Sequence, residues 1–476
     1  MLQIYEKLQN FLGAFLLLSV LSLSSCATYY EKNLKFQESF VQGEFEKADK
    51  LLGDPEKASE GRNRLLFFLH KGVVLHMLER YEESNSYFEQ AYIFLEDYKK
   101  SYGMEALSLV SNSSIKTYIG EDHEKVLLHY YKALNYLKLN QPNSALVECK
   151  RLNIKLQALN DKYEGKKNRY KNDAFAHLLM GIAYDMDKDV NNAFIAYRNA
   201  YNAYKNSYSP DFSVDIPVQL KQDLLRTAYL NGFTEELRFY EKEFETKYVY
   251  SRGEGGELIF FWHNGLGPVK SEWSVNFTIV KGEGGEAFFV NEELGLRFPY
   301  RHEDKDEDGK GLGDLKIVRV AFPKYLIRPT VYQYAHLQKG EAVYPLEKAE
   351  DIQAIALSVL NDRMLREFAT SITRLALKQS AEEALREENQ EAGMLLSVFN
   401  AATEKADTRN WQTIPNSIYY SRIPLELGSN KISLNTFEEG EFDNPQNLEN
   451  FEFFVEDKGM IFHIYSNLES YSPVNP

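Results

Sequence analysis

The chain has 476 residues and a net charge of −15, from 55 Lys and Arg residues against 70 Asp and Glu residues. Hydrophobic residues make up 44% of the chain, which excludes a wholly disordered protein, and the length predicts two or three folded domains. The negative charge argues against a nucleic-acid-binding protein, because contacts to phosphates need a basic surface. The presence of only two cysteines excludes a disulfide-rich scaffold.

The N-terminal segment has the features of an export signal. Residues Phe11–Leu23 form an apolar run that is shorter than the roughly 20 residues needed to span a bilayer. The run ends in Leu23-Ser24-Ser25-Cys26, which resembles a bacterial lipobox. An ordinary secretory signal and an uncleaved anchor helix are the alternatives.

The lipobox resemblance implies that residues 1–25 are removed as a signal peptide and that Cys26 becomes the lipid attachment site, carrying acyl chains such as palmitate. Two or more acyl chains hold a protein stably at a membrane. Ala27 follows the cysteine, where many lipoproteins retained in the inner membrane have an aspartate. The expected location is therefore the outer membrane of the cell envelope.

Residues 26–247 are predicted to be helical, because apolar residues recur at spacings of three and four. Three segments share a finer pattern, in which small and large residues follow one another at spacings of 12, 4 and 3. Small residues at such positions allow two antiparallel helices to approach closely. The three sets are Gly72, Ser84, Phe88 and Ala91; Ala133, Ala145, Cys149 and Leu152; and Gly181, Ala193, Tyr197 and Ala200.

This pattern resembles the tetratricopeptide repeat, a helical unit of about 34 residues. A large residue, Tyr184 in the third copy, stands three positions after the first small residue and would fill the gap to the next pair. The resemblance implies an α-solenoid with a concave groove for a peptide or protein. Helices near Glu38–Leu52 and Val218–Glu245 would cap it. An unspecialised helical bundle is the alternative.

Residues 248–476 are predicted to form an antiparallel β-rich, sandwich-like domain. Glu257–Trp262 is a continuous apolar run, as expected of a strand that is buried on both faces. Two hairpins are predicted, with turns at Gly428-Ser429-Asn430 and at Asp457-Lys458-Gly459. A helical insertion at about 346–405 would pack on the sheet. The predicted fold class is therefore α+β.

The order of several short motifs resembles that of a whole family. The lipobox and the repeats are followed by Asn264–Lys270, Val320–Pro323, Asp362–Met364 and Ala406–Trp411. The series is similar to uncharacterised Gram-negative outer-membrane lipoproteins with helical repeats in front and a β-rich half behind. Members are often encoded beside the small lipoprotein that activates penicillin-binding proteins. The resemblance implies an envelope setting, linked to peptidoglycan assembly, and brings no assigned activity.

An acidic loop is the one candidate metal site. Asp304, Asp306 and Asp308, followed by a glycine, match the start of a calcium-binding loop. The glutamate expected at the twelfth position is replaced by Leu315. A solvated acidic hairpin tip is therefore favoured over a Ca²⁺ site, and no other cofactor is predicted.

A second candidate site lies where the helical insertion returns to the sheet. Asp407, Arg409 and Trp411, together with Asn264, could bind a ligand or clamp this junction, and the clamp is favoured. His263 is interpreted as structural. The sequence contains no H-E-x-x-H motif and no G-x-S-x-G motif, so no catalytic residue is predicted.

The sequence thus predicts a non-catalytic lipoprotein that acts as a protein-binding scaffold in the cell envelope. An envelope protein is the expected partner, the lipid anchor the expected membrane contact, and nucleic acid is not expected to bind. A small-molecule ligand is left unidentified. The alternatives are a glycan-capturing lipoprotein that works with an outer-membrane transporter and a Ca²⁺-dependent hydrolase of envelope polymers.

Overall fold

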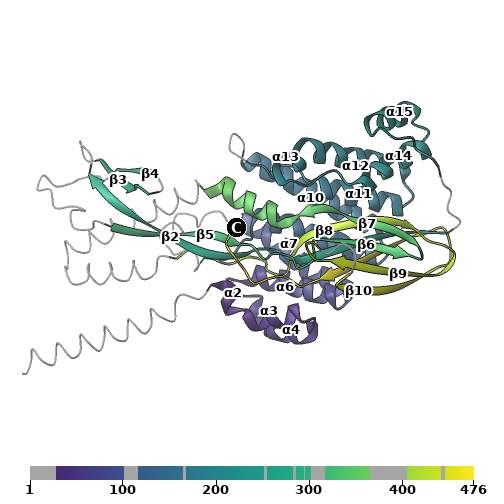
Figure 1. The fold of residues 1–476 in the computed structure, drawn as a ribbon. Coiled ribbons are helices and arrows are strands. Elements are labelled where there is room, and N and C mark those ends of the chain that lie inside the picture. Colours follow the sequence, from purple (N-terminus) through teal and green to yellow (C-terminus); the bar gives the residue numbers. More distant parts are fainter. Residues whose placement is uncertain are drawn as a thin grey trace, which may run out of the picture.

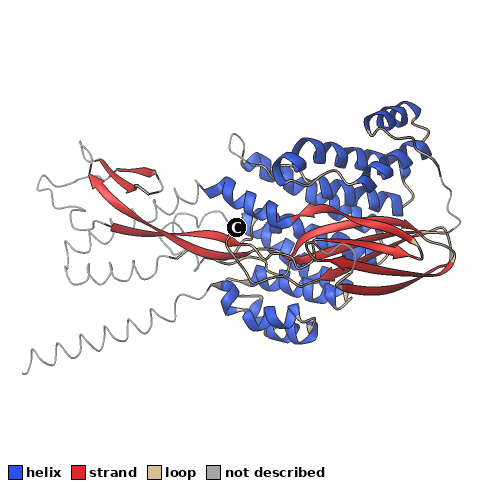
Figure 2. Ribbon diagram, in the orientation of Figure 1, coloured by secondary structure: helices blue, strands red, loops and turns tan. Residues whose placement is uncertain are grey.

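The computed structural model describes residues 28–100, 116–163, 168–250, 255–281, 286–293, 295–301, 317–364, 405–440 and 445–476. Cys26, the acidic residues Asp304, Asp306 and Asp308, and residues 365–404 of the predicted insertion lie outside the described residues. A helical array packs against a seven-stranded sheet, and a ribbon of strands projects from one end (Figures 1 and 2). The predicted α+β class is confirmed.

The described helices form five antiparallel pairs, each joined by a three-residue turn, which we call hairpins 1 to 5. They are α3 (Leu34–Val41) with α4 (Phe45–Leu51), α6 (Arg64–Met77) with α7 (Tyr81–Lys100), α9 (Asp122–Lys138) with α10 (Pro142–Lys162), α11 (Ala174–Met186) with α12 (Val190–Ala203), and α14 (Val218–Leu230) with α15 (Thr234–Glu243). Short helical turns complete the region: α2 (Tyr29–Lys32), α5 (Pro55–Ala58), the π-helical turn η3 (Tyr204–Tyr208) and α13 (Ser209–Phe212).

The same turn closes all five hairpins. Its middle residue has a positive φ between 55° and 75°, and the N–H groups of this residue and of the next one donate to carbonyls of the helix that ends there. The regions predicted as caps therefore form hairpins 1 and 5 of the same kind. The five middle residues are Gly43, Glu79, Asn140, Lys188 and Gly232.

Small residues let the paired helices touch. A Cβ atom added to Gly72 would lie 2.6 Å from the Phe88 ring, and one added to Gly181 would lie 2.4 Å from the Tyr197 ring. The backbone carbonyl of Gly72 also accepts a hydrogen bond from Ser84 Oγ at 2.7 Å. Tyr184 is partly buried against the same core, in which Ala91, Ala133, Ala145, Ala193 and Ala200 are fully buried.

The large sheet has the strand order β10-β9-β6-β7-β8-β1-β11. Neighbouring strands are antiparallel, except that β1 and β11 are parallel. The bounds are β1 (Glu257–Leu266), β6 (Tyr334–Lys339), β7 (Ala342–Asp351), β8 (Pro415–Pro424), β9 (Gly428–Phe437), β10 (Asn447–Val455) and β11 (Met460–Asn467).

Strand β1 separates two cores. Leu258, Phe260 and Trp262 belong to a core formed by the sheet alone, whereas Ile259 and Phe261 point to the opposite face and join the helical core. Alternate residues of a strand face opposite sides, so burial on both sides explains the continuous apolar run.

The sheet curls around its own core instead of pairing with a second sheet, as the predicted sandwich-like packing would require. The edge strands β10 and β11 approach each other through their side chains. The ring centroids of Phe451 and Tyr465 are 5.7 Å apart, and those of Phe453 and His463 are 5.3 Å apart. The side chains that would be buried between two sheets in a sandwich are here buried inside the curl of one sheet.

Both hairpins predicted in the C-terminal part are wrong. Strands β8 and β9 follow each other in the chain, but β6 and β7 lie between them in the sheet. Strands β10 and β11 are joined by a short turn, yet their backbones pair with β9 and β1, respectively. A tight turn reverses the chain without deciding the pairing, because here the partners are chosen by burial of side chains distant in sequence.

The helical insertion begins later than predicted. Residues 346–351 belong to β7, and the helix covers 352–364 before the described part of the insertion ends. Asp351 caps this helix, because its Oδ1 accepts a hydrogen bond from the N–H of Ala354 at 2.9 Å.

The smaller sheet has the strand order β4-β3-β2-β5 and forms the projecting ribbon (Figure 1). Its bounds are β2 (Val269–Lys281), β3 (Glu286–Asn291), β4 (Leu296–Arg301) and β5 (Ile317–Leu326). Near the body, Tyr325 of β5 packs on Ala356 and Leu360 of the helix at 352–364. The insertion helix and the ribbon are thus fixed to each other.

We predict that Gly181→Ala destabilises the protein by about 1–3 kcal/mol through overpacking. The Tyr197 ring that the new Cβ meets cannot move aside freely, because its hydroxyl donates to Asp185 at 2.9 Å and lies 3.0 Å from Arg422 Nη2. Urea unfolding measures the loss. Gly61→Ala is the matched control, since its Cβ would meet no atom closer than 3.7 Å. Equal unfolding midpoints for the two variants would contradict the packing described above.

Candidate functional site

The helical array meets the sheet along the first helices of its hairpins. One continuous core contains residues of α6, α9 and α11 together with Ile259, Phe261 and Tyr420 of the sheet. Figure 2 shows these helices lying along one side of the strands. The face on which a concave groove was expected is therefore covered by the chain's own sheet. We take this helix–sheet interface as the candidate site, because it contains the predicted residues Asp407, Arg409 and Trp411.

The segment 405–414, which we call the strap, runs along this interface before β8. Trp411 is fully buried, and its ring lies near Phe88 and Tyr131, at centroid distances of 6.0 and 5.5 Å. Its backbone N–H donates to Glu124 Oε1 at 2.6 Å, and its indole N–H donates to Thr413 at 3.0 Å. Trp411 therefore holds the strap on hairpins 2 and 3 and leaves no ring face open to a ligand.

Arg409 ties three segments together. Its guanidinium forms two hydrogen bonds with Asp407, at 2.8 and 2.6 Å, and donates to Asn63 Oδ1 at 3.0 Å and to the Lys116 carbonyl at 2.9 Å. The guanidinium also lies 5.2 Å from the centre of the Tyr118 ring. With its donors engaged inside the protein, the pair acts as a clamp of the strap.

Asn264 does not contact the strap in this way; it joins β1 to the segment that contains Tyr332. Its side chain lies in β1 and donates to the Tyr332 carbonyl at 2.8 Å. The neighbouring His263 is also buried, between the Tyr130 hydroxyl at 2.8 Å and Ser466 Oγ at 3.3 Å. Burial, with a smaller effect of His76, lowers the pKa of His263 to about 3, so its ring is neutral. Both residues fasten strands to the surrounding chain.

Two buried carboxyls at the start of α9, those of Glu121 and Glu124, have pKa values shifted in opposite directions. Burial opposes ionisation of Glu121, but Arg363 and Lys270 together hold its pKa well below the usual range. Burial and the nearby Glu121 raise the pKa of Glu124, although hydrogen bonds from Trp411, Tyr118 and the Glu121 N–H act against the shift. Two neighbouring carboxyls with opposite shifts are typical of a general acid and base.

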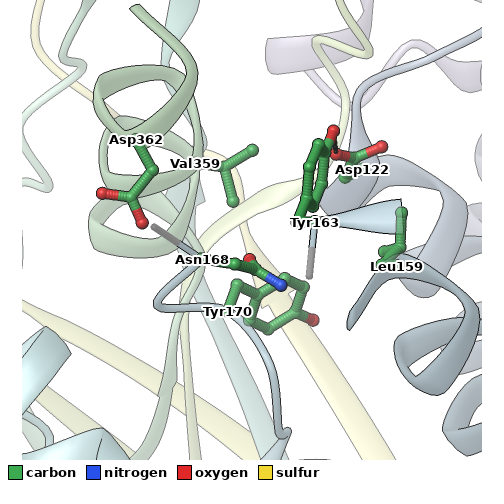
Figure 3. A pocket seen from close by; sticks show the side chains of 7 residues that line it. All are labelled: Asp122, Leu159, Tyr163, Asn168, Tyr170, Val359 and Asp362. Atoms are coloured by element: carbon green, nitrogen blue, oxygen red, sulfur yellow. Dashed lines mark hydrogen bonds between the residues drawn. The ribbon is translucent and has the colours of Figure 1, made fainter. Parts of the chain in front are cut away.

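Both members of this pair are closed off from solvent. Both glutamates are at least 95% buried, with exposures of 4% and 1%. A cavity lined by the neighbouring Asp122 holds about 10 Å³, enough for about one water molecule. Figure 3 shows its lining, in which Tyr163 and Asp122 face each other. The Tyr163 hydroxyl donates a hydrogen bond to Asp122 Oδ2 at 2.6 Å. Asp362 lies on the other side and binds Arg169 at 3.0 Å.

A second charged cluster joins β8 to hairpins 4 and 5. Arg422 lies 2.7 Å from Asp185 and 2.8 Å from Asp223, and its exposure is 8%. Arg226 pairs with the same two aspartates. Burial opposes ionisation of Asp185, but the two arginines lower its pKa. Burial raises the pKa of Asp223 to about 6 in spite of them. Hydrogen bonds from Arg226 and Tyr197 favour the charged form of Asp185, whereas the nearby charges of Asp185 and Glu257 help to raise the pKa of Asp223.

Sequence reasoning missed both charged clusters. One signal was present: Arg422 follows Ile418 and Tyr420 at strand spacing, so a charged residue stands on an apolar face. Such a residue needs a buried counter-charge. Nothing in the sequence identified Asp185 or Asp223 as that partner, since they lie in distant helices.

The part of the chain that the structure describes contains no group of three or more His, Cys, Asp or Glu residues placed to hold a metal ion. Among the same residues, no helix combines the length and the apolar character needed to cross a bilayer.

Comparison with known proteins gives a general likeness in the helical part. No protein-family model and no curated protein matches the chain. Two of the similar solved structures each match 45% of this chain. MamA from Desulfovibrio magneticus RS-1 has 17% sequence identity, with 89% of that chain covered and a TM-score of 0.28. The TPR-like repeats of a putative kinesin light chain from Podosopora anserina have 13% identity, with 94% of that chain covered and a TM-score of 0.28. A third is the Rap conjugation gene regulator of plasmid pLS20 with the Phr* peptide (15% identity, 45% and 54% coverage, TM-score 0.26).

TM-scores below 0.5 establish neither a common fold nor a function. The assignment of tetratricopeptide-like hairpins therefore rests on the chain's own turns and packing.

We predict that Arg422→Met costs about 3–5 kcal/mol of unfolding free energy, because it leaves two buried carboxylates with Arg226 as their remaining arginine partner. Arg80→Met is the matched control. Arg80 and Glu83 form an exposed pair, with side-chain exposures of 49% and 56%, so its loss should cost less than about 1 kcal/mol. Urea unfolding at pH 7 compares the two variants. A similar loss in both would show that the Arg422 cluster does not hold the interface.

We predict that His123→Phe stabilises the protein. His123 is 1% exposed, and neither ring nitrogen has a hydrogen-bond partner among the described residues, so the substitution should gain about 1–2 kcal/mol at pH 7. Burial lowers the pKa of His123 to about 4. Below pH 6.5 the unfolded chain therefore takes up a proton that the folded chain refuses, and wild-type stability falls.

The advantage of His123→Phe should accordingly grow by roughly 2 kcal/mol between pH 7 and pH 5, since each pKa unit corresponds to about 1.4 kcal/mol. Thermal unfolding at the two pH values measures the difference. A variant that is less stable than the wild type at both values would contradict the prediction.

Proposed function

We propose that the protein is a non-catalytic, lipid-anchored scaffold of the cell envelope. The observation that carries this proposal is the helix–sheet interface, where the array and the sheet share one core and Arg422 of the sheet pairs with Asp185 and Asp223 of the array. A body closed in this way suits a rigid support for protein contacts better than an enzyme, because its acid–base pair is shut off from solvent.

An envelope protein is the proposed partner, and its contacts fall outside the helix–sheet interface. The usual binding face of a helical repeat array is occupied here by the strap and by β1 and β8. A partner that bound the same face would have to displace the buried Trp411 and separate Arg422 from its aspartates. Binding through the solvent-facing sides of the array and through the ribbon avoids both costs.

The membrane attachment is proposed on the lipobox, with Cys26 as the acylated residue and the outer membrane as the location. The first described helix, α2, lies at the end of the body from which the ribbon projects, and α2 contacts β2 (Figure 1). An anchor at Cys26, just before α2, would therefore place the base of the ribbon near the membrane.

We predict that Cys26→Ser moves the protein from the membrane fraction to the soluble fraction. Two acyl chains hold a protein at a membrane, and the serine cannot carry the thioether chain. Fractionation of cells with immunoblotting measures the shift. Cys149→Ala is the control, because Cys149 is fully buried and should not change the fraction. Unchanged fractionation of Cys26→Ser, together with an intact and uncleaved N-terminus, would refute the anchor.

A further inference from the structure

A polar cavity of about 240 Å³ lies on the solvent-facing side of hairpin 4, where α12 passes into the π-helical turn η3. It is separate from the helix–sheet interface. Its lining is polar except for Ala203 and consists of Asn172, His177, Asn199, Asn202, Asn206 and Ser207.

The helix positions the amides on one side. Asn199, Asn202 and Asn206 follow each other at spacings of three and four, which places them on one face of a helix. The wall behind them is anchored from inside, because the Tyr204 hydroxyl donates to the Ala349 carbonyl at 2.6 Å and Tyr208 is fully buried. π-helical turns are rare in proteins, and those that occur are often found at functional sites. The amides therefore project from a preformed wall.

The polar groups of the cavity are available for a ligand. The side chains of Asn199, Asn202 and Asn206 are exposed and make no hydrogen bond to another residue in the described ranges. His177 Nδ1 is buried and has no partner there either. Only the Asn172 side chain is engaged, as its oxygen accepts from the N–H of Asp173 at 3.0 Å. Each free amide offers both a donor and an acceptor.

The lining selects the chemistry of the ligand. It contains no lysine, arginine, aspartate or glutamate, so a charged ligand would lose its hydration without gaining a counter-charge. Ala203 alone offers apolar surface, so an apolar molecule or a peptide with apolar side chains would find little to pack against. Burial lowers the pKa of His177, and its neutral ring adds one donor and one acceptor. A compact molecule rich in hydroxyl groups fits this set.

We propose that this cavity is a binding subsite for one neutral sugar residue. The asparagine amides and His177 hydrogen-bond the sugar hydroxyls, and the open side of the cavity leaves room for a longer chain. This inference goes beyond the scaffold function and does not depend on the lipid anchor or on a protein partner.

The test uses the purified chain without its leader and the free sugars glucose and N-acetylglucosamine, followed by saturation-transfer-difference NMR. We expect dissociation constants on the order of millimolar, because a single shallow cavity offers few contacts. Asn202→Ala and His177→Phe should each weaken binding roughly tenfold by removing a hydrogen bond to the sugar. Asn191→Ala is the matched control, since Asn191 is exposed on the same helix and does not line the cavity.

Circular dichroism confirms that each variant is folded, and Asn199→Ala, at another exposed position, replaces any variant that is not. Sugar binding that weakens roughly tenfold in the cavity variants and is unchanged in Asn191→Ala supports the subsite. Absence of saturation transfer at tens of millimolar sugar overturns it. So does an equal effect of all the variants. If trialanine binds and the sugars do not, the cavity recognises a peptide backbone and the sugar assignment is wrong.

Discussion

Strand β1 is apolar on both faces, and the rest of the structure depends on covering each of them. Leu258, Phe260 and Trp262 need the curl of the sheet, whereas Ile259 and Phe261 need the first helices of the array. Each buried side chain of this size contributes about 1.5–3 kcal/mol, so neither face can be left in water. An array standing apart from the sheet would lose one complete core. The two halves of the chain therefore form one body, although their local sequences predict separate domains.

The buried charges of the interface determine how the sheet is aligned on the helical array more than they determine the stability of the protein. Removing Arg422, Asp185 and Asp223 from water costs several kcal/mol per ion, and their mutual attraction roughly offsets that cost. A misaligned interface would keep the cost and lose the attraction. Apolar side chains tolerate small shifts, whereas these ion pairs require β8 to sit in one register against hairpins 4 and 5. We infer that the hydrophobic contacts bring the halves together and that the ion pairs select one arrangement.

The sequence predicted the inner hairpins and missed the outer ones for a physical reason. The residue seven positions before the middle of the turn is Gly72, Ala133 or Gly181 in hairpins 2 to 4, and in hairpins 2 and 4 an aromatic ring of the second helix lies against it. In hairpins 1 and 5 that position holds Phe36 and Leu225, so the small-residue pattern is absent while the turn is kept. Local features thus predicted the elements. The clamp by Arg409 was predicted, but its partners Asn63 and Lys116 and the strand order could not be, because they depend on contacts between residues far apart in the chain.

The occupied face decides where recognition can occur. A partner could enter the array only by lifting the strap and β8, which would expose Trp411 and leave Asp185 and Asp223 with half of their counter-charge. The second cost alone is about 3–5 kcal/mol, of the order of an entire weak association. A binding surface on the outside avoids that cost, since nothing there has to be displaced. The amide-lined cavity of hairpin 4 meets this condition: its polar groups face solvent, and its wall is anchored from the inside by Tyr204. Filling the inner face thus makes the array rigid and transfers ligand recognition to its outer side.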